Sequence, residues 1–134
     1  MYALRQLHKA LRPLGALLDV HPEPQHSMIE IRTGEQTIAV GQVDQTQDID
    51  EITSAQAALR HVRAEGLFVL ERELSFEFVR HFESVETWLA YRAGRKSRGT
   101  IADETLSRSR ALLAQAPGEL CVRGDIHAAR YRKT

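Results

Sequence analysis

The sequence predicts an α+β fold, in which helices pack on a mixed, largely antiparallel sheet of about five strands. Three observations lead to this fold class. Apolar residues recur at helical spacing at the start of the chain, an alternating pattern flanks a glycine turn in residues 28–43, and a period of two runs through residues 67–82. Helical and strand patterns therefore follow one another along a single chain.

The length and charge of the chain set limits on what it can be. A chain of 134 residues forms one domain, residues 1–134, because a domain of this size buries roughly two-thirds of its unfolded surface. Eighteen basic and eighteen acidic residues give a formal net charge of zero, so no overall field attracts nucleic acid or anionic lipid. The single cysteine, Cys121, excludes a disulfide framework and a zinc site built from several cysteines, and we expect it to be a small core residue.

Nothing in the sequence predicts a membrane segment. The apolar runs are far shorter than the roughly 18 residues that a membrane span needs. Arg5, His8 and Lys9 interrupt the apolar pattern at the N-terminus, which is unlike a signal peptide. We therefore expect a cytoplasmic protein without a membrane partner.

The first helix is predicted where leucines fall at helical spacing, at Leu4, Leu7, Leu11 and Leu14. Pro13 and Gly15 end this helix. The apolar run of residues 16–20 then stops before Pro22, which has no amide hydrogen for a ladder. This run predicts a buried strand that opens into a loop.

Residues 28–43 predict a β-hairpin. With Gly34 and Glu35 as a two-residue type II′ loop, Thr33 faces Gln36, Ile31 faces Ile38, and Ile29 faces Val40. The branched apolar residues then share one face of the hairpin, so the register and the burial agree.

A helix and a long strand are predicted next. Asp48 and Glu51 resemble a capping box before a helix that Gly66 ends. In residues 67–82 most of the apolar side chains occupy even positions, which indicates a strand with a buried face. We expect its phenylalanines to belong to the core and not to a base-stacking platform: Phe68, Phe76, Phe78 and Phe82.

Two helices and a last strand complete the prediction. Ser84 caps a short helix that Gly94 closes, and a second helix begins near Asp103 and ends at Pro117. Residues 119–132 alternate loosely and predict the final strand, in which Gly124 marks a bulge.

The segment LHKALRPLGALLDV resembles part of the class I S-adenosylmethionine-dependent methyltransferases. In that family a helix ends in a Leu-Lys/Arg-Pro-Gly-Gly turn that leads into the fifth strand of the sheet. The turn is matched by Leu11, Arg12, Pro13 and Gly15, with Leu14 in place of the first glycine. Residues 67–82 and 119–132 are placed like the sixth and seventh strands, which form the antiparallel edge. The resemblance implies the distal half of that sheet.

The same resemblance implies that the cofactor-binding half lies outside this sequence. In the family, the cofactor sits on a glycine-rich turn after the first strand, and this chain has no G-x-G-x-x-G or equivalent motif. Methyl transfer requires a donor held in line with its nucleophile. We therefore expect no cofactor in this chain and no catalysis by the isolated chain.

The loop after the first predicted strand holds the candidate ligand residues Asp19, His21, Glu23 and His26. The functional interpretation is a metal site or a substrate-side contact at the end of a strand, where open α/β sheets place ligands. His21 and His26 are five residues apart in a proline-bearing loop, which fits no ligand spacing that we can justify physically. The sequence favours a loop without chemistry and predicts no metal site.

Two other groups carry possible chemistry. Asp125 and His127 alternate onto one strand face with Arg123, and because no motif places a nucleophile beside them, the sequence favours a solvated edge face over an oriented base. The only basic patch comprises Arg92, Arg95, Lys96 and Arg98, near an aromatic pair. Such a patch binds nucleic acid with a steep salt dependence, although a solvated loop is the more ordinary interpretation.

These features lead to three functional hypotheses. The first is a non-catalytic, methyltransferase-like fragment that acts as an oligomeric binding or interaction module. The second is a subunit that completes a methyltransferase together with a separate cofactor-binding chain. The third is nucleic-acid binding through the loop of residues 92–98.

The first hypothesis predicts a homodimer. Half of a sheet leaves apolar faces without partners, and such surfaces attract a second chain. We expect the interface to involve the first helix and the hairpin face, through Leu4, Leu7, Leu11, Ile29, Ile31, Ile38 and Val40.

Overall fold

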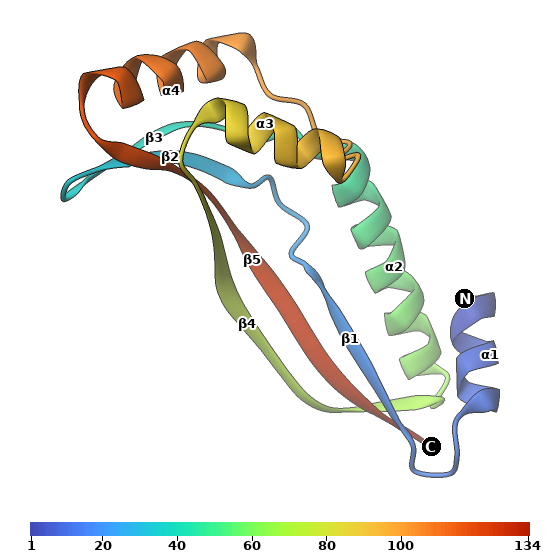
Figure 1. Cartoon of the computed structure of the whole chain (residues 1–134). Coiled ribbons are helices and arrows are strands. Elements are labelled where there is room, and N and C mark those ends of the chain that lie inside the picture. The colour runs from blue at the N-terminus through green and yellow to red at the C-terminus, as the bar shows by residue number, and fades with distance from the viewer. The chain divides into compact units, whose positions relative to one another are not determined.

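The computed structural model describes all 134 residues, which form four helices and five strands (Figure 1). The helices are α1 (Tyr2–Ala10), α2 (Thr46–Ala64), α3 (Val85–Gly94) and α4 (Asp103–Gln115). The strands are β1 (Ala16–Pro22), β2 (Met28–Thr33), β3 (Gln36–Gln42), β4 (Phe68–Phe82) and β5 (Gly118–Lys133). None of the helices combines the length and the apolar character that crossing a membrane requires.

The predicted α+β class is confirmed. The five strands form one open sheet in the order β1, β5, β2, β3, and β4 also pairs with β5. The sheet is antiparallel throughout and not mixed. The central strand is β5, the last element of the chain, so the sheet is completed by residues that are far from most of their partners in sequence.

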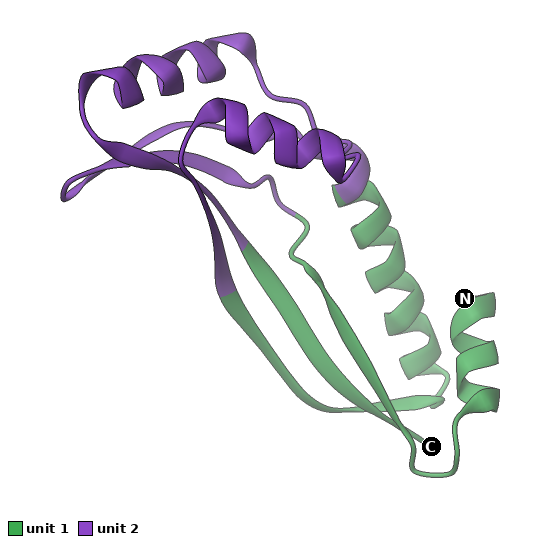
Figure 2. Cartoon of the chain, in the orientation of Figure 1, with its two compact units in different colours: residues 1–24, 49–76, 125–134 green, residues 25–48, 77–124 purple.

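The chain divides into two compact units (Figure 2). Unit 1 comprises residues 1–24, 49–76 and 125–134, and unit 2 comprises residues 25–48 and 77–124. The strands β4 and β5 contribute residues to both units. Each unit is built from more than one segment of the chain, three in unit 1 and two in unit 2.

The core of unit 1 forms between α1, α2 and the strands. Leu59 and Val62 of α2 pack with Phe68, Ala129 and Tyr131, and all five are buried. Leu4 of α1 and Leu11, which follows the helix, pack against this cluster, whereas Leu7 is exposed. The apolar stripe of the first helix is therefore used mostly inside the chain.

The core of unit 2 forms where α3 and α4 cover the hairpin of β2 and β3 (Figure 1). Ile29 and Ile31 are fully buried there, Val40 is buried, and Ile38 packs against the same cluster. The expectation that this hairpin face lacks a partner within the chain is wrong. Trp88 of α3 and the leucines of α4 cover it within the chain.

The predicted pairing of the hairpin strands is confirmed next to the turn, but it is wrong further from the turn. Thr33 pairs with Gln36 and Ile31 with Ile38, and Gly34 has the positive φ of 59° that a type II′ loop needs at its first position. Between Ile29 and Glu30 the register shifts, so that Ile29 pairs with Gly41 and not with Val40. A β-bulge inserts one residue, which alternation alone does not reveal.

The predicted start of α2 is also corrected. The helix begins at Thr46, so Asp48 lies within its first turn and is not a cap. The carboxylate of Asp44 accepts hydrogen bonds from the amide and the hydroxyl of Thr46, at 3.1 and 2.7 Å. At α3 the prediction is confirmed, because the Ser84 hydroxyl accepts a hydrogen bond from the Thr87 amide at 3.0 Å.

The phenylalanines of β4 do not form one buried stripe. Phe68 is buried in unit 1 and Phe82 is half-buried in unit 2, but Phe76 and Phe78 are both nearly half exposed. The expectation that Phe76 and Phe78 are core residues is wrong. Only the ends of the strand lie under helices, since Phe68 packs with Leu59 and Val62 of α2 and Phe82 lies beside Trp88 of α3.

Candidate functional site

Three of the four candidate residues come together on β1 and the loop that follows it in unit 1. Asp19 and His21 are two residues apart on a strand, so their side chains project from the same face. The carboxylate Oδ2 of Asp19 lies 3.3 Å from Nε2 of His21. Both side chains are largely buried.

The ladder between β1 and β5 adds His127 to this pair. His21 lies directly opposite His127, and the centroids of the two rings are 5.3 Å apart. Nδ1 of His127 lies 3.3 Å from Oε1 of Glu23, and the Glu23 amide donates to the Asp125 carbonyl at 2.8 Å. The candidates Asp19, His21 and Glu23 therefore form one polar cluster with His127.

The strand β4 contributes the remaining members of this polar cluster. The hydroxyl of Ser75 donates to Oε1 of Glu23 at 2.7 Å, and Oε2 of Glu73 lies 3.6 Å from Nε2 of His127. Ser75 thus donates to a carboxylate and not to an imidazole, which is not the arrangement of a nucleophile and its base. Nothing in the local sequence around Glu73 or Ser75 indicated this contact, because it depends on how β4 pairs with β5.

His26 lies apart from this cluster, in unit 2. Its Nδ1 accepts a hydrogen bond from the Gln45 amide at 3.0 Å, while the Gln45 side chain accepts one from the Ser27 amide at 2.8 Å. These contacts fix the loop that precedes α2. His26 therefore acts in the local structure, and the structure does not bring it to His21.

A cavity of about 390 Å³ lies beside Asp19 and His21 in unit 1. Its walls are mainly aliphatic and come from α1, β1 and α2: Met1, Leu4, Leu7, Leu17, Leu18, Ala55, Gln56, Ala58 and Leu59. Cavities of this size hold small ligands, and a few polar groups orient them. The carboxylate and the imidazole supply that polar side.

The opposite face of the same strands is apolar and exposed. Leu18 and Val20 of β1 are 70% and 65% exposed. Glu73 and Ser75 contact the polar cluster, so by alternation Leu74 and Phe76 project from the other face of β4, and each is almost half exposed. We call Leu18, Val20, Leu74 and Phe76 the apolar face of unit 1.

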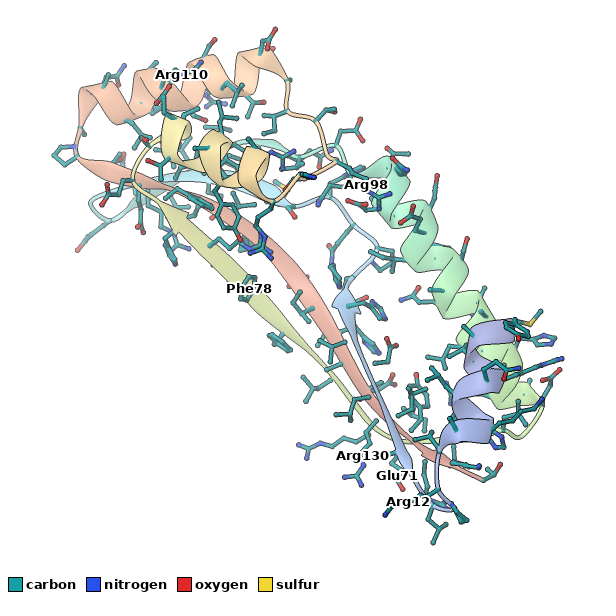
Figure 3. All side chains as sticks on the ribbon, turned by 45° about the vertical axis from the view of Figure 1, so that its right-hand side comes forward. Arg12, Glu71, Phe78, Arg98, Arg110 and Arg130 are labelled. Carbon is teal, nitrogen blue, oxygen red and sulfur yellow. The ribbon has the colours of Figure 1, made fainter.

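An ion-pair cluster borders this face. The Glu71 carboxylate accepts a hydrogen bond from Arg132 at 2.9 Å and lies 3.2 Å from the guanidinium of Arg130. Figure 3 shows the side chains of Glu71 and Arg130 near each other. The arginine stems and the apolar side chains together make a surface with an apolar centre and a charged margin, which is the composition of a protein interface.

The basic loop of unit 2 is engaged in contacts within the chain. Arg92 donates to the Gly99 carbonyl and lies 5.7 Å from the centroid of the Trp88 ring, and burial lowers the pKa of its guanidinium. Arg98 pairs with Asp48 at the first turn of α2 (Figure 3). Arg95 stacks over Tyr91 at 5.3 Å. These contacts hold the arginine side chains against the chain itself, and Asp48 balances the charge of Arg98.

In unit 2, β4 and β5 bring together three residues that the sequence analysis did not group. Nδ1 of His81, Oε1 of Glu119 and Sγ of Cys121 all lie within 4.8 Å of one another. Cys121 is fully buried, as expected of a core residue, and burial raises the pKa of its thiol. Glu119 and Cys121 share one face of β5, but the sequence does not show that His81 lies beside them, because His81 is on β4.

No protein-family description, no curated sequence and no solved structure matches this chain. The function proposed below therefore rests on the geometry of the structure.

Proposed function

We propose that this chain is a binding module, non-catalytic on its own, that resembles the distal half of a class I methyltransferase and acts as a homodimer. The observation that carries the proposal is the apolar face of unit 1. Leu18 and Val20, which the sequence assigned to a buried strand, are mostly exposed. Large exposed apolar patches of this kind mark interaction sites on soluble proteins.

The strand arrangement supports the resemblance. The turn matched by Leu11, Arg12, Pro13 and Gly15 lies between α1 and β1, which is where the family places it. β4 and β5 are antiparallel neighbours, like the sixth and seventh strands of that family, and β5 lies between β1 and β4.

A second copy is the occupant that fits the apolar face. Two copies related by a two-fold axis bring the same face together, so each apolar side chain finds an apolar partner without a further component. The Glu71 ion pairs then lie at the rim, where charged groups remain solvated. The proposed interface therefore lies on β1 and β4 and not on the β2–β3 hairpin.

Light scattering during gel filtration tests this proposal. At micromolar concentration we expect twice the chain mass of 15.1 kDa. Leu18→Glu should give the monomer, because it forces a carboxylate into a desolvated surface. Leu14→Glu is the matched control, since Leu14 and Leu18 are both 70% exposed and Leu14 lies outside the face. A wild-type mass near 15.1 kDa would rule out the homodimer.

The second hypothesis, a companion cofactor-binding chain, is favoured by the edge of the sheet. β1 pairs only with β5, so the backbone groups on its other side can accept a strand from another protein. In the resembled family the fifth strand has the fourth strand on that side. This hypothesis and the first agree that the isolated chain does not bind S-adenosylmethionine.

Equilibrium dialysis with S-adenosylmethionine checks that shared expectation. Micromolar binding by the isolated chain would contradict both hypotheses.

For the third hypothesis, binding to a nucleic-acid duplex should be weak and should not fall steeply with salt, because Arg92 and Arg98 are engaged within the chain.

A further inference from the structure

We propose that His81, Glu119 and Cys121 in unit 2 form a zinc-binding site. This site is independent of the proposed dimer and of the polar cluster in unit 1. It consists of one imidazole, one carboxylate and one thiol, which are the three side-chain types that zinc prefers.

The distances between the three ligand atoms fit a shared metal ion. Nδ1 of His81 lies 3.0 Å from Oε1 of Glu119 and 3.4 Å from Sγ of Cys121, and Sγ lies 3.7 Å from Oε1. With ordinary zinc bond lengths, tetrahedral ligands of these types are separated by roughly 3.3–3.6 Å. Small movements of the side chains would therefore place all three atoms around one ion.

The strands hold these atoms in place. Glu119 and Cys121 lie two residues apart on β5 and project from the same face, and β4 brings His81 beside them. Cys121 is fully buried, so its position is set by the core. The polar cluster of unit 1 does not converge on one ion in this way, because the two nitrogens of His127 face two different carboxylates, those of Glu23 and Glu73.

The surrounding charges are balanced. Arg32 lies opposite Glu119 and Glu30 lies opposite Cys121 in the ladder between β2 and β5. Glu30 is itself paired with Arg123, at 2.6 Å. A zinc ion between a thiolate and a carboxylate would add two positive charges to two negative ligands.

Three protein ligands leave one coordination position open. Almost half of the surface of the His81 and Glu119 side chains is exposed, so water or a ligand atom can reach that position from solvent. Closed structural zinc sites have four protein ligands, whereas sites with three bind water or a substrate atom in the fourth position. The site is therefore of the exchangeable kind, and its fourth ligand would be a water molecule.

Cobalt(II) titration of the full chain tests the site, because cobalt occupies zinc sites and is coloured. Cys121 is the only cysteine, so a thiolate-to-cobalt charge-transfer band can come from no other residue. We expect this band together with the strong visible bands of tetrahedral cobalt, and we expect zinc to displace the cobalt and bleach both.

Variants assign the ligands. Cys121→Ser should abolish the charge-transfer band, and His81→Ala and Glu119→Gln should each weaken cobalt binding by about tenfold or more. His81 is exposed enough that its variant keeps the fold, which circular dichroism verifies. His21→Ala is the matched control, since it removes the histidine of the other polar cluster, and it should bind cobalt like the wild type.

Two outcomes would overturn the proposal. One is the absence of a charge-transfer band in the wild type at a saturating cobalt concentration. The other is a band that persists with unchanged affinity in both His81→Ala and Glu119→Gln, since the thiol would then bind cobalt without its neighbours.

Discussion

Leu14 occupies a backbone conformation that is unfavourable for leucine. Its φ is 62°, in the left-handed region, and its side chain is mostly exposed. The resembled family has glycine at this place in the turn. The backbone conformation and the exposure of this position favour glycine over leucine, because glycine adopts positive φ without a steric cost.

Leu14→Gly should be tolerated, and we expect the free energy of unfolding to rise by up to about 1 kcal/mol. The gain comes from relieved backbone strain, partly offset by the greater freedom of glycine in the unfolded chain. Denaturant unfolding measures it. Leu14→Ala, which shortens the side chain but keeps the strain, should show no such gain, and a loss of several kcal/mol for Leu14→Gly would contradict the expectation.

Asp44 links the charge of one side chain to the start of α2. The hydrogen bond from the Thr46 hydroxyl, and next the one from the Thr46 amide, lower the pKa of the Asp44 carboxyl below its ordinary value of 3.8. Because the folded-state pKa is the lower one, the carboxylate stabilises the fold above pH 3.8. This stabilisation is lost as the pH falls through the folded-state pKa.

Asp44→Ala should lower the melting temperature at neutral pH, and its difference from the wild type should narrow in acid. Thermal melting followed by circular dichroism at a series of pH values measures this. Thr46→Val removes only the hydroxyl donor and should reproduce part of the effect. A difference that is the same at neutral pH and below pH 3.8 would show that the charge of Asp44 is not involved.

The β2–β3 hairpin shows how one element acquires its role from its neighbours. Ile31 and Ile38 face each other across the hairpin, yet Ile31 is fully buried and Ile38 only partly. β5 pairs with β2, so β2 is interior to the sheet, whereas β3 is an edge strand. The same residue type in the same register therefore contributes different amounts of stability.

Ile31→Ala should lower the free energy of unfolding by about 2–5 kcal/mol, because it leaves a cavity in a core that cannot fully collapse. Ile38→Ala is the matched control and should cost clearly less, since its side chain is already partly solvated. Urea unfolding of both variants measures the two losses. Equal losses would mean that α3 and α4 cover both strands alike.

The chain has no net charge that would oppose the proposed homodimer. Its formal charge of zero and pI of about 7.0 remove long-range repulsion at neutral pH. In the proposed homodimer, the apolar face of unit 1 would meet a second copy without an electrostatic barrier. Association and folding are coupled in such a protein by mass action.

The melting temperature should therefore rise when the protein concentration is increased by about a hundredfold. Differential scanning calorimetry of the wild type measures this dependence. Leu18→Glu should melt at one temperature at every concentration, while Leu14→Glu should behave like the wild type. A wild-type melting temperature that does not change with concentration would contradict the homodimer.

The sequence by itself determined the kinds of element and most of their ends. The signals are local: periods of two and of 3.6 residues, and the turn and cap residues Gly34, Gly66 and Ser84. Because they act within a few residues, they can be recognised in the sequence without knowledge of tertiary contacts. Even the pairing of Asp19 with His21 follows from their spacing on one strand.

The tertiary structure alone decided which faces are covered and which side chains meet. An apolar stripe looks the same in sequence whether a helix lies over it or not, which is why Ile29 proved buried and Phe76 exposed. His127 reaches Glu23, and His81 reaches Cys121, only because β5 pairs with strands from distant parts of the chain. Such contacts depend on strand order and register, and those are properties of the whole sheet.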